Sequence, residues 1–369
     1  MTIAVRNPPA TVMKSSISII VCCYNSEQRL PETLRCLATL ETGDLQVELI
    51  LVDNRSTDST KEIARQLWAQ YGSAIPLIVA DQPVPGLAAA RRKGIAASQS
   101  EYLLFCDDDN WLDRGYLAYA VEVMEVHPEV GILGGLNEPA CEVEPPGWFA
   151  KAGRAYAVGP QEPSTGEAWL IWGAGMVLRK SALVALQEVG FQNLLSDRKG
   201  GNLSSGGDYE LCWALRMAGI KLWYDERLRL QHFIPKERLT EVYLRRLFRS
   251  TAYCVLGLQP YQSILERDIR RENEITRTIF WRKAARLFVE LSGETVQLKP
   301  LFAVLKSDLL ALLSFRRRLL MLWICLLHTG ELVRNTKSVL VLRRRLNARH
   351  TTEAAPNEGE GLQCHAART

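Results

Sequence analysis

The sequence predicts an α/β fold with a mostly parallel sheet flanked by helices, followed by a C-terminal helical extension. Three observations predict it. Short apolar, β-branched runs alternate with helix-like segments through the first third of the chain, and polar residues directly follow several of those runs. The last third is rich in arginine and has helical spacing. Alternation of strand and helix is typical of parallel sheets that are covered on both faces.

The first part of the chain supplies the alternating elements in order. Pro31 suits the first turn of the helix after the first strand, and Asp58 suits the start of the next helix. The alanine-rich segment that follows Gly86 is also expected to be helical. The expected strands are 18–21, 47–52, 77–79, 102–106 and 132–133, and the expected helices include 31–40, 86–97 and 115–126.

The pattern loosens after residue 137, where proline and glycine mark a loop-rich stretch. Residues 169–178 are expected to return as a strand or buried segment, and the glycine- and serine-rich span 191–207 is expected to be mobile. Residues 208–218 have helical spacing, which stops at Gly219. Two short apolar runs, 222–224 and 228–233, come next, and the second carries His232.

Size and composition indicate a folded chain with several parts. Its 369 residues are 47% hydrophobic and 23% charged, which suffices for one large domain plus an extension or for two domains. We expect a flexible N-terminus (1–15), a catalytic domain (16–236), a basic helical extension (237–350) and a disordered tail (351–369). The first residues lack the apolar core of a signal peptide, so a cytoplasmic location is expected.

Charge and cysteine usage exclude some classes of function. The net charge of +4 is mild, and the C-terminal arginines lack an aromatic recognition motif, so nucleic-acid binding is not expected. The nine cysteines include no CxxC pair, and histidine is too scarce for a zinc cluster. Reduced cysteines that act as small apolar residues are the simplest interpretation.

Three consecutive aspartates, Asp107, Asp108 and Asp109, end the apolar run of residues 102–113 (YLLFCDDDNWLD). Adjacent carboxylates repel one another, and each loses solvation as it leaves water. A divalent cation such as Mg²⁺ or Mn²⁺ would remove this conflict, since hard cations prefer carboxylate oxygens. The alternative is a solvated acidic turn. Ligands of parallel α/β sheets bind beyond the carboxyl ends of the strands, where Asn25 and Asp53 are also expected, and this convergence favours a functional site.

Four segments together resemble the family 2 glycosyltransferases, which have the GT-A fold. They are SIIVCCYN, ELILVDNRSTDST, GLAAARRKGIAASQSEYLLFCDDDNWL and GGDYELCWALRMAGIKLWYDERLRLQH, and they span roughly residues 16–233 in the right order. The resemblance implies transfer of a sugar from a nucleoside diphosphate donor, with UDP as the expected nucleotide. It also implies inversion at the anomeric carbon and a need for Mg²⁺ or Mn²⁺.

The resemblance gives the donor side of the site its expected residues. The aspartate triplet corresponds to the family's DxD signature, with Asp109 on the metal and Asp107 and Asp108 toward the donor, although the triplet fits more than one frame. Asp53 is expected on the nucleotide base, or it only shapes the turn. Tyr24 and Asn25 end the first strand, where Tyr24 either stacks on the base or serves as a strand-end tyrosine.

Three further residues are expected at the phosphates, the acceptor and the metal. Arg91 lies where the family commonly has an arginine near the nucleotide, and guanidinium suits phosphate; the alternative is a solvated helix residue. Asp208 matches the family's catalytic base, although the usual preceding glutamate is Gly207 here; the alternative is a helix N-cap. His232 is expected as a further metal ligand or as a structural histidine.

The leading hypothesis is therefore an inverting, metal-dependent glycosyltransferase that modifies a glycan or lipid-linked acceptor for cell-surface polysaccharide or glycoconjugate synthesis. A catalytically idle membrane-surface or assembly protein is the second hypothesis, because Gly207 replaces an acidic residue. A nucleotidyltransferase is disfavoured, since no glycine-rich, lysine-bearing phosphate loop follows the first strand. The apolar segment 319–327 is too short to cross a bilayer, and with Arg316–Arg318 before it we expect a helix lying on the anionic inner face of the cell membrane, or packed on the catalytic domain.

Overall fold

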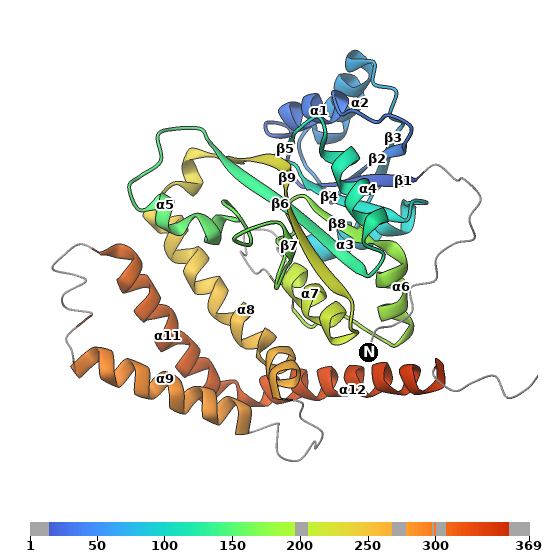
Figure 1. Ribbon diagram of the computed structural model, residues 1–369. Helices are drawn as coiled ribbons and strands as arrows, with labels where there is room; N and C mark the ends of the chain where they lie inside the picture. The colour runs from blue at the N-terminus through green and yellow to red at the C-terminus, as the bar shows by residue number, and fades with distance from the viewer. Residues whose placement is uncertain (1–14, 196–205, 268–277, 297–298, 300–307, 354–369) are drawn as a thin grey trace, which may run out of the picture.

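A nine-stranded mixed sheet forms the centre of the molecule (Figure 1). The computed structural model describes residues 15–195, 206–267, 278–296, 299 and 308–353. The expected flexible N-terminus, most of the expected mobile loop and most of the expected tail lie outside these residues. The strands are β1 (Ser16–Cys23), β2 (Gln46–Asp53), β3 (Leu77–Asp81), β4 (Tyr102–Asp107), β5 (Asn110–Leu112), β6 (Val130–Cys141), β7 (Gly166–Glu167), β8 (Met176–Arg179) and β9 (Lys221–Ile234).

The order of the strands explains where the site forms. The sheet runs β3-β2-β1-β4-β8-β6-β9-β5, and β7 pairs with β9. The first four strands are mutually parallel, as the alternating sequence predicts, whereas β8 is antiparallel to both β4 and β6. The parallel half therefore brings the ends of β1, β2 and β4 to one edge, with Cys23 beside Asp53 and Cys22 beside Asp107.

Helices cover the two faces of the sheet, so that the sheet lies between two hydrophobic cores. Residues of β1 alternate between these cores: Ile17, Ile19 and Val21 face one, and Ile20 faces the other. The helices are α1 (Leu30–Ala38), α2 (Thr60–Tyr71), α3 (Leu87–Ala97), α4 (Tyr116–Val126), α5 (Phe149–Ala152), α6 (Lys180–Glu188) and α7 (Gly207–Met217), with short 3₁₀ helices η1 (Gly153–Tyr156) and η2 (Lys236–Arg238).

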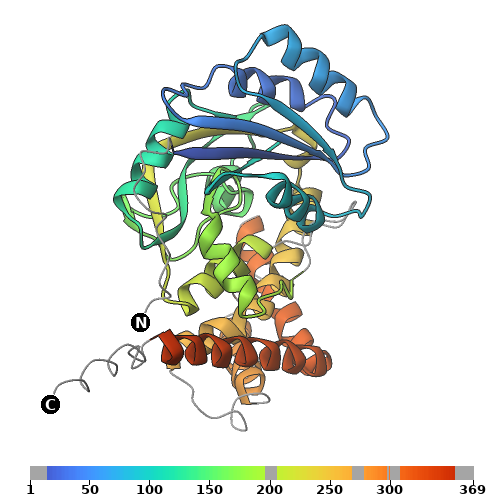
Figure 2. The ribbon, with the colours of Figure 1, turned by 90° about the vertical axis from the view of Figure 1, so that its right-hand side faces the viewer.

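The C-terminal extension is helical, as expected, and it lies below the sheet in Figure 2. Its helices are α8 (Glu241–Arg267), α9 (Thr278–Val296), α11 (Leu309–Leu327) and α12 (Thr329–Glu353). Buried residues of α8, α11 and α12, such as Tyr261, Ile324 and Leu346, belong to the same hydrophobic cluster as those of α6 and α7. This cluster crosses the expected domain boundary at residue 237.

Several sequence expectations need adjustment at the level of elements. The segment 169–178 is mostly loop, and only its end belongs to β8. The two apolar runs around Asp225 form one continuous 14-residue strand, β9. α12 extends three residues into the expected tail. Across the described residues, every helix is too short or too polar to span a bilayer, and all the cysteines are free thiols.

Candidate active site

A cavity of about 810 Å³ lies at the carboxyl ends of the parallel strands. Its walls come from the ends of β1 and β4, from α3, from η1, from residues 172–174, from α7 and from the C-terminal helix α8. Of the residues expected from the sequence, all but Asp53 line it: Tyr24, Asn25, Arg91, Asp107, Asp108, Asp109, Asp208 and His232. The fold therefore gathers residues that lie as much as 208 positions apart in the sequence, Tyr24 and His232, into one cavity.

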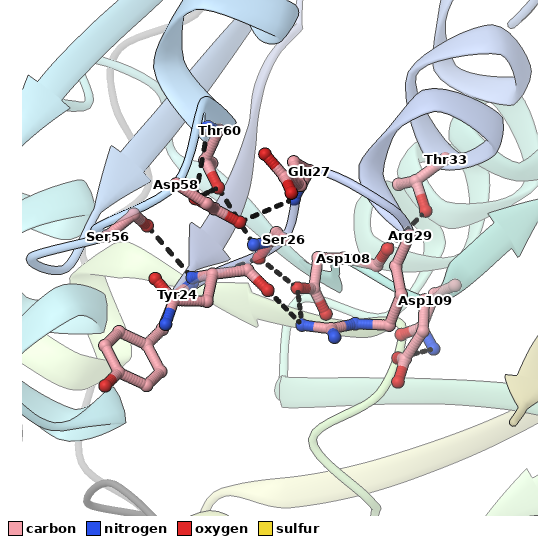
Figure 3. A network of polar contacts seen from close by, with 12 residues as sticks. Tyr24, Ser26, Glu27, Arg29, Thr33, Ser56, Asp58, Thr60, Asp108 and Asp109 are labelled. Atoms are coloured by element: carbon pink, nitrogen blue, oxygen red, sulfur yellow. Dashed lines mark hydrogen bonds and ion pairs between the residues drawn. The ribbon is translucent and has the colours of Figure 1, made fainter.

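Asp108 is turned toward helix α1 (Figure 3). Its carboxylate accepts a hydrogen bond from Ser26 Oγ and pairs with Arg29 Nη2 at 2.6 Å, and its backbone oxygen accepts one from Thr33 Oγ1. Burial and the adjacent Asp109 raise the pKa of Asp108, although Arg29 acts in the opposite direction. These contacts commit the Asp108 carboxylate to the start of α1, so Asp107 and Asp109 are the stronger candidates for contact with a donor.

Asp109 faces two nitrogen-bearing side chains that both come from the segment at the end of β9. His232 lies opposite Asn110 in the register of β5 and β9, with Nε2 3.6 Å from Asp109 Oδ1. Arg238, in η2, places Nη1 2.9 Å from Asp109 Oδ2. Only 4% of the Asp109 side chain is exposed. A carboxylate oxygen and an imidazole nitrogen thus lie close together in a buried position.

These residues fit a divalent cation that is also held by a ligand. Among the described residues, no three His, Cys, Asp or Glu side chains converge as a metal site. Mg²⁺ in nucleotide enzymes usually binds through one or two protein ligands together with substrate phosphates. Asp109 and His232 offer such a pair. The donor set suits a cation that arrives with a diphosphate better than one held by the protein alone.

The opposite end of the cavity carries the residues expected at the nucleotide base. Tyr24 is 49% exposed, and its ring points away from the polar network around Ser26 and Asp108 (Figure 3). Asn25 joins two strand ends: its backbone adopts a φ of 48°, and its Oδ1 accepts a hydrogen bond from the backbone N–H of Thr57. Asn25 is therefore committed to shaping the loops, and the exposed Tyr24 ring is available to a ligand.

Asp53 lies beside these residues, although it is not among those that line the cavity. It is 3% exposed, and its Oδ1 has no hydrogen-bond partner among the described residues. A buried acceptor without a partner costs free energy, so such an atom marks a place where a ligand N–H can bind. The contact between Asp53 and a nucleotide base stays an expectation, since Asp53 is buried and does not line the cavity.

Asp208 is fixed by backbone groups at the start of α7. Gly173 N–H donates to Asp208 Oδ2 at 2.9 Å, and Tyr209 N–H donates to Oδ1. The N-cap of α7 is Gly206, and no side chain caps it, so the interpretation of Asp208 as a helix cap is wrong. Asp208 instead has an oriented carboxylate that lines the cavity.

Gly173 also explains how Arg91 approaches this carboxylate. A Cβ at position 173 would lie 2.7 Å from Arg91 Nη2 and 3.2 Å from Asp208 Oδ2. The Arg91 guanidinium lies 5.3 Å from the centre of the Phe105 ring, which supports it from the other side. A Cβ at position 173 would therefore make the Arg91 guanidinium, and to a smaller extent the Asp208 carboxylate, shift from this arrangement.

Sequence reasoning missed Arg29, Arg238 and Tyr243. Arginines at the start of a helix and after a strand are usually solvated, and nothing in the local sequence distinguishes these two. Tyr243 is also part of the cavity wall, but it belongs to α8, in the region assigned to the extension.

Comparison with known proteins agrees with this geometry. Residues 18–183 match the sequence profile described as glycosyl transferase family 2. The chain is 36% identical over 104 residues to the glycosyltransferase AglE of Haloferax volcanii, covering 27% of this chain and 34% of AglE. It is 31% identical over 106 residues to the cholesterol galactosyltransferase of Borreliella burgdorferi, covering 29% and 28%. The chain thus spans about a third of the length of the curated relatives that it matches.

A solved structure extends the likeness to most of the chain. The mannosyltransferase PcManGT from Pyrobaculum calidifontis, solved with GDP-Man and Mn²⁺, superposes with a TM-score of 0.53. The alignment covers 85% of this chain and 87% of that protein, at 16% identity. At this identity the likeness establishes the fold.

Proposed function

Because residues 18–183 belong to glycosyl transferase family 2 and the chain has the GT-A fold, we propose that this protein transfers a sugar from a nucleoside diphosphate donor to an acceptor hydroxyl. The transfer inverts the anomeric carbon and takes place in the cavity described above. The acceptor is a glycan or a lipid-linked glycan of the cell surface. UDP is the first nucleotide to test, since the orphaned Asp53 oxygen suits the N–H of uracil.

The donor side of the cavity binds and orients the nucleotide. Tyr24 stacks on the base, Asp53 accepts its N–H, and Asp107 faces the donor. Asp109 and His232 would hold Mg²⁺ or Mn²⁺, and the bound ion would supply Lewis-acid stabilisation of the diphosphate leaving group. Arg91 adds a guanidinium suited to the phosphates.

The acceptor side supplies the base. The acceptor oxygen forms a bond to the anomeric carbon while the bond from that carbon to the diphosphate oxygen breaks. The proton of the acceptor hydroxyl goes to the Asp208 carboxylate, and the electron pair of the broken bond leaves on the diphosphate. The hydrogen bond from Gly173 N–H to Oδ2 fixes the carboxylate in the orientation that this proton transfer needs.

One observation favours this proposal over the alternative of a catalytically idle protein. Asp208, which is oriented by backbone N–H groups, lines the same cavity as the Asp109–His232 pair. A catalytically idle protein that keeps only the fold would need neither the oriented Asp208 carboxylate nor the Asp109–His232 pair. The missing glutamate at Gly207 affects the helix start, where backbone donors already orient the aspartate.

The experiment that tests the proposal is a panel of UDP-, GDP- and TDP-sugars with Mn²⁺, in which donor hydrolysis and nucleotide binding are measured with and without EDTA. The wild-type protein should bind one nucleotide in a metal-dependent way, and Asp109→Asn should abolish that dependence. Asp113→Asn, an exposed aspartate at the end of the same segment, is the matched control. Absence of metal-dependent binding across the panel would refute the proposal, and binding without hydrolysis or transfer would favour the idle protein.

We also propose that the protein acts at an anionic membrane surface, on the cytoplasmic side. Large apolar side chains are exposed on α9 and α11: Trp281, Phe288, Val289, Leu319, Trp323, Leu326 and Leu327. The inner side of α11 packs on the protein, because Met321 and Ile324 belong to the core. Both expected roles of this segment are therefore supported, one on each side of the helix. Arginines 317 and 318 contact Phe248 and Glu294, which leaves exposed Arg316 as the better candidate for lipid contact.

A further inference from the structure

Arg238 occupies the carboxylate that a donor-bound cation would use. Its Nη1 lies 2.9 Å from Asp109 Oδ2, and its side chain is 19% exposed. Burial lowers the pKa of Arg238, whereas Asp109, Tyr243 and Asp108 together raise it, and the net direction is upward, so the guanidinium is charged. The protein therefore places a positive charge of its own, the Arg238 guanidinium, on the carboxylate of Asp109.

The two oxygens of Asp109 face different partners. Oδ1 accepts a hydrogen bond from Asn110 Nδ2 at 3.3 Å and faces His232, and Oδ2 binds Arg238. A divalent cation on the Oδ1 side would lie close to the guanidinium, and like charges repel strongly in a site with little water. The metal alone should therefore bind weakly as long as Arg238 stays on Asp109.

A diphosphate changes this balance. Arg238 lines the same cavity as Tyr24, Arg91 and Asp107, so an anionic ligand there offers the guanidinium a second partner. Guanidinium binds phosphate through paired, charge-assisted hydrogen bonds. Once the arginine has moved to the phosphate, Asp109 Oδ2 is released from its ion pair and the nearby positive charge is neutralised.

The geometry points to Arg238 as an exchangeable counter-ion, which holds Asp109 in the donor-free protein and moves to the diphosphate when donor and metal bind together. This inference rests on the proposed function and adds a residue to it. It makes metal and nucleotide binding mutually dependent, because each ligand removes the obstacle to the other. It also protects Asp109 from free metal ions when no donor is present.

The test compares wild-type protein with Arg238→Gln, which removes the charge and keeps a side chain of similar shape. Mn²⁺ affinity is measured by titration without nucleotide, and UDP and GDP affinities are measured with saturating Mn²⁺. In the variant, Mn²⁺ alone should bind about tenfold tighter, and the nucleotide about tenfold weaker, as expected when one charge is removed from a partly buried site. The opposite signs matter, since general damage to the fold would weaken both.

Two further variants make the result specific. Arg238→Lys keeps the charge, so Mn²⁺ alone should stay weak while nucleotide binding falls, because an ammonium lacks the paired donors. Arg154→Gln is the matched control: Arg154 lines the same cavity but binds the carbonyl oxygens of Pro160 and Gln161. It should leave Mn²⁺ affinity unchanged.

The outcomes separate this inference from the proposed function. Mn²⁺ affinity that is unchanged or lower in Arg238→Gln overturns the exchange, even if wild-type protein binds a nucleotide with Mn²⁺. If wild-type protein binds neither nucleotide while Arg238→Gln still gains Mn²⁺ affinity, the competition at Asp109 stands and the donor proposal fails. If Arg238→Gln does not fold, Arg238→Lys still decides: its nucleotide affinity must fall while Mn²⁺ alone stays weak, and unchanged nucleotide affinity overturns the exchange.

Discussion

At the scale of single residues, Gly173 shows how a missing side chain shapes the site. Its N–H orients Asp208, and the space where its Cβ would lie is taken by the Arg91 guanidinium. A glycine is needed here because of this close approach, since its φ is not among the positive values of the chain. Any other residue type at position 173 would therefore displace the guanidinium or the carboxylate from its present place.

We predict that Gly173→Ala keeps the fold and lowers kcat. The added methyl displaces Arg91 or Asp208, and a misplacement of about 1 Å at a reacting group can cost on the order of 10²-fold in rate. The measurement is initial rate of sugar transfer, with circular dichroism as a check of folding. Gly147→Ala, at a glycine with no atoms within 4 Å of the added Cβ, is the control and should match the wild-type rate. A normal rate in Gly173→Ala would mean that Arg91 and Asp208 can shift without loss of catalysis.

We predict a different outcome for Asp208→Asn. An amide keeps an oxygen for Gly173 N–H but cannot accept the acceptor's proton, so transfer should fall by about 10²- to 10⁴-fold. Nucleotide affinity with Mn²⁺ should not change, because the proposed role of Asp208 is to act on the acceptor. Transfer at close to the wild-type rate would exclude Asp208 as the base.

The sequence predicted the acidic residues of this site better than the basic ones. Asp109 and Asp208 could be predicted because carboxylates after an apolar run or a glycine-rich loop are unusual. Arg29 and Arg238 could not, because their partners lie 79 and 129 residues away in the sequence. Such pairings depend on how the sheet is closed, and local spacing carries no information about them.

At the scale of elements, α7 is tied to the loop before it and to α8 by one buried glutamate. Glu210 is fully buried and accepts hydrogen bonds from the backbone N–H groups of Leu194 and Leu195 and from the hydroxyl of Tyr261. Burial raises the pKa of Glu210, although these donors act in the opposite direction. The helix that carries Asp208 is thereby anchored to the C-terminal extension.

We predict that Tyr261→Phe lowers the free energy of unfolding by about 1–3 kcal/mol at neutral pH, because a buried carboxylate loses a donor. The variant raises the pKa of Glu210 further in the folded state and leaves it unchanged in the unfolded chain. The destabilisation should therefore be largest above the folded-state pKa and shrink as the pH falls below it. Urea unfolding across this range measures the effect, with Tyr253→Phe, an exposed tyrosine of the same helix, as the control. A cost that does not depend on pH would contradict the role of the carboxylate.

Most strands and helices could be predicted from the sequence. The prediction was wrong for the long strand β9. The strands and helices before residue 133 lie close to their predicted places, since each has its own periodicity. β9 was predicted as two short runs because Asp225, Glu226 and Arg227 interrupt its apolar pattern. In the structure, Arg227 pairs with Asp225 and with Glu122 of α4 beside the strand, so the charges are tolerated within it.

At the scale of the whole molecule, the C-terminal helices have an inner side and an outer side with different roles. The inner side completes the core below the sheet, and arginines of α12 bind α6 and its end, as when Arg349 pairs with Glu188. Removal of these helices should therefore expose the core. The outer side carries exposed tryptophan and leucine, and only substitutions there can test membrane contact without unfolding the protein.

We predict that the double variant Trp323→Ser, Leu327→Ser keeps its thermal stability and loses binding to vesicles of phosphatidylglycerol and phosphatidylcholine. These side chains are 49% and 64% exposed, and burial of each in the lipid interface contributes about 1.5–3 kcal/mol. Vesicle cosedimentation measures the loss, and wild-type binding should weaken with salt. Val126→Ser, Val143→Ser, two exposed apolar residues of the catalytic domain, form the control. Absence of wild-type binding at low salt would disprove the membrane role.

The pairing of β5 with β9 has a consequence for how the chain is made. Asn110 of β5 cannot pair with β9 until His232, about 120 residues later in the chain, has been synthesised. At ribosomal rates of roughly 5–20 residues per second this delay lasts roughly 6–24 s. The hydrophobic cluster between the sheet and the C-terminal helices is completed later still, once Leu346 of α12 has been synthesised. During that interval the nascent chain exposes apolar strands to solvent. Its yield in cells should therefore depend on chaperones that bind it during synthesis, and on translation that is not slowed between these segments.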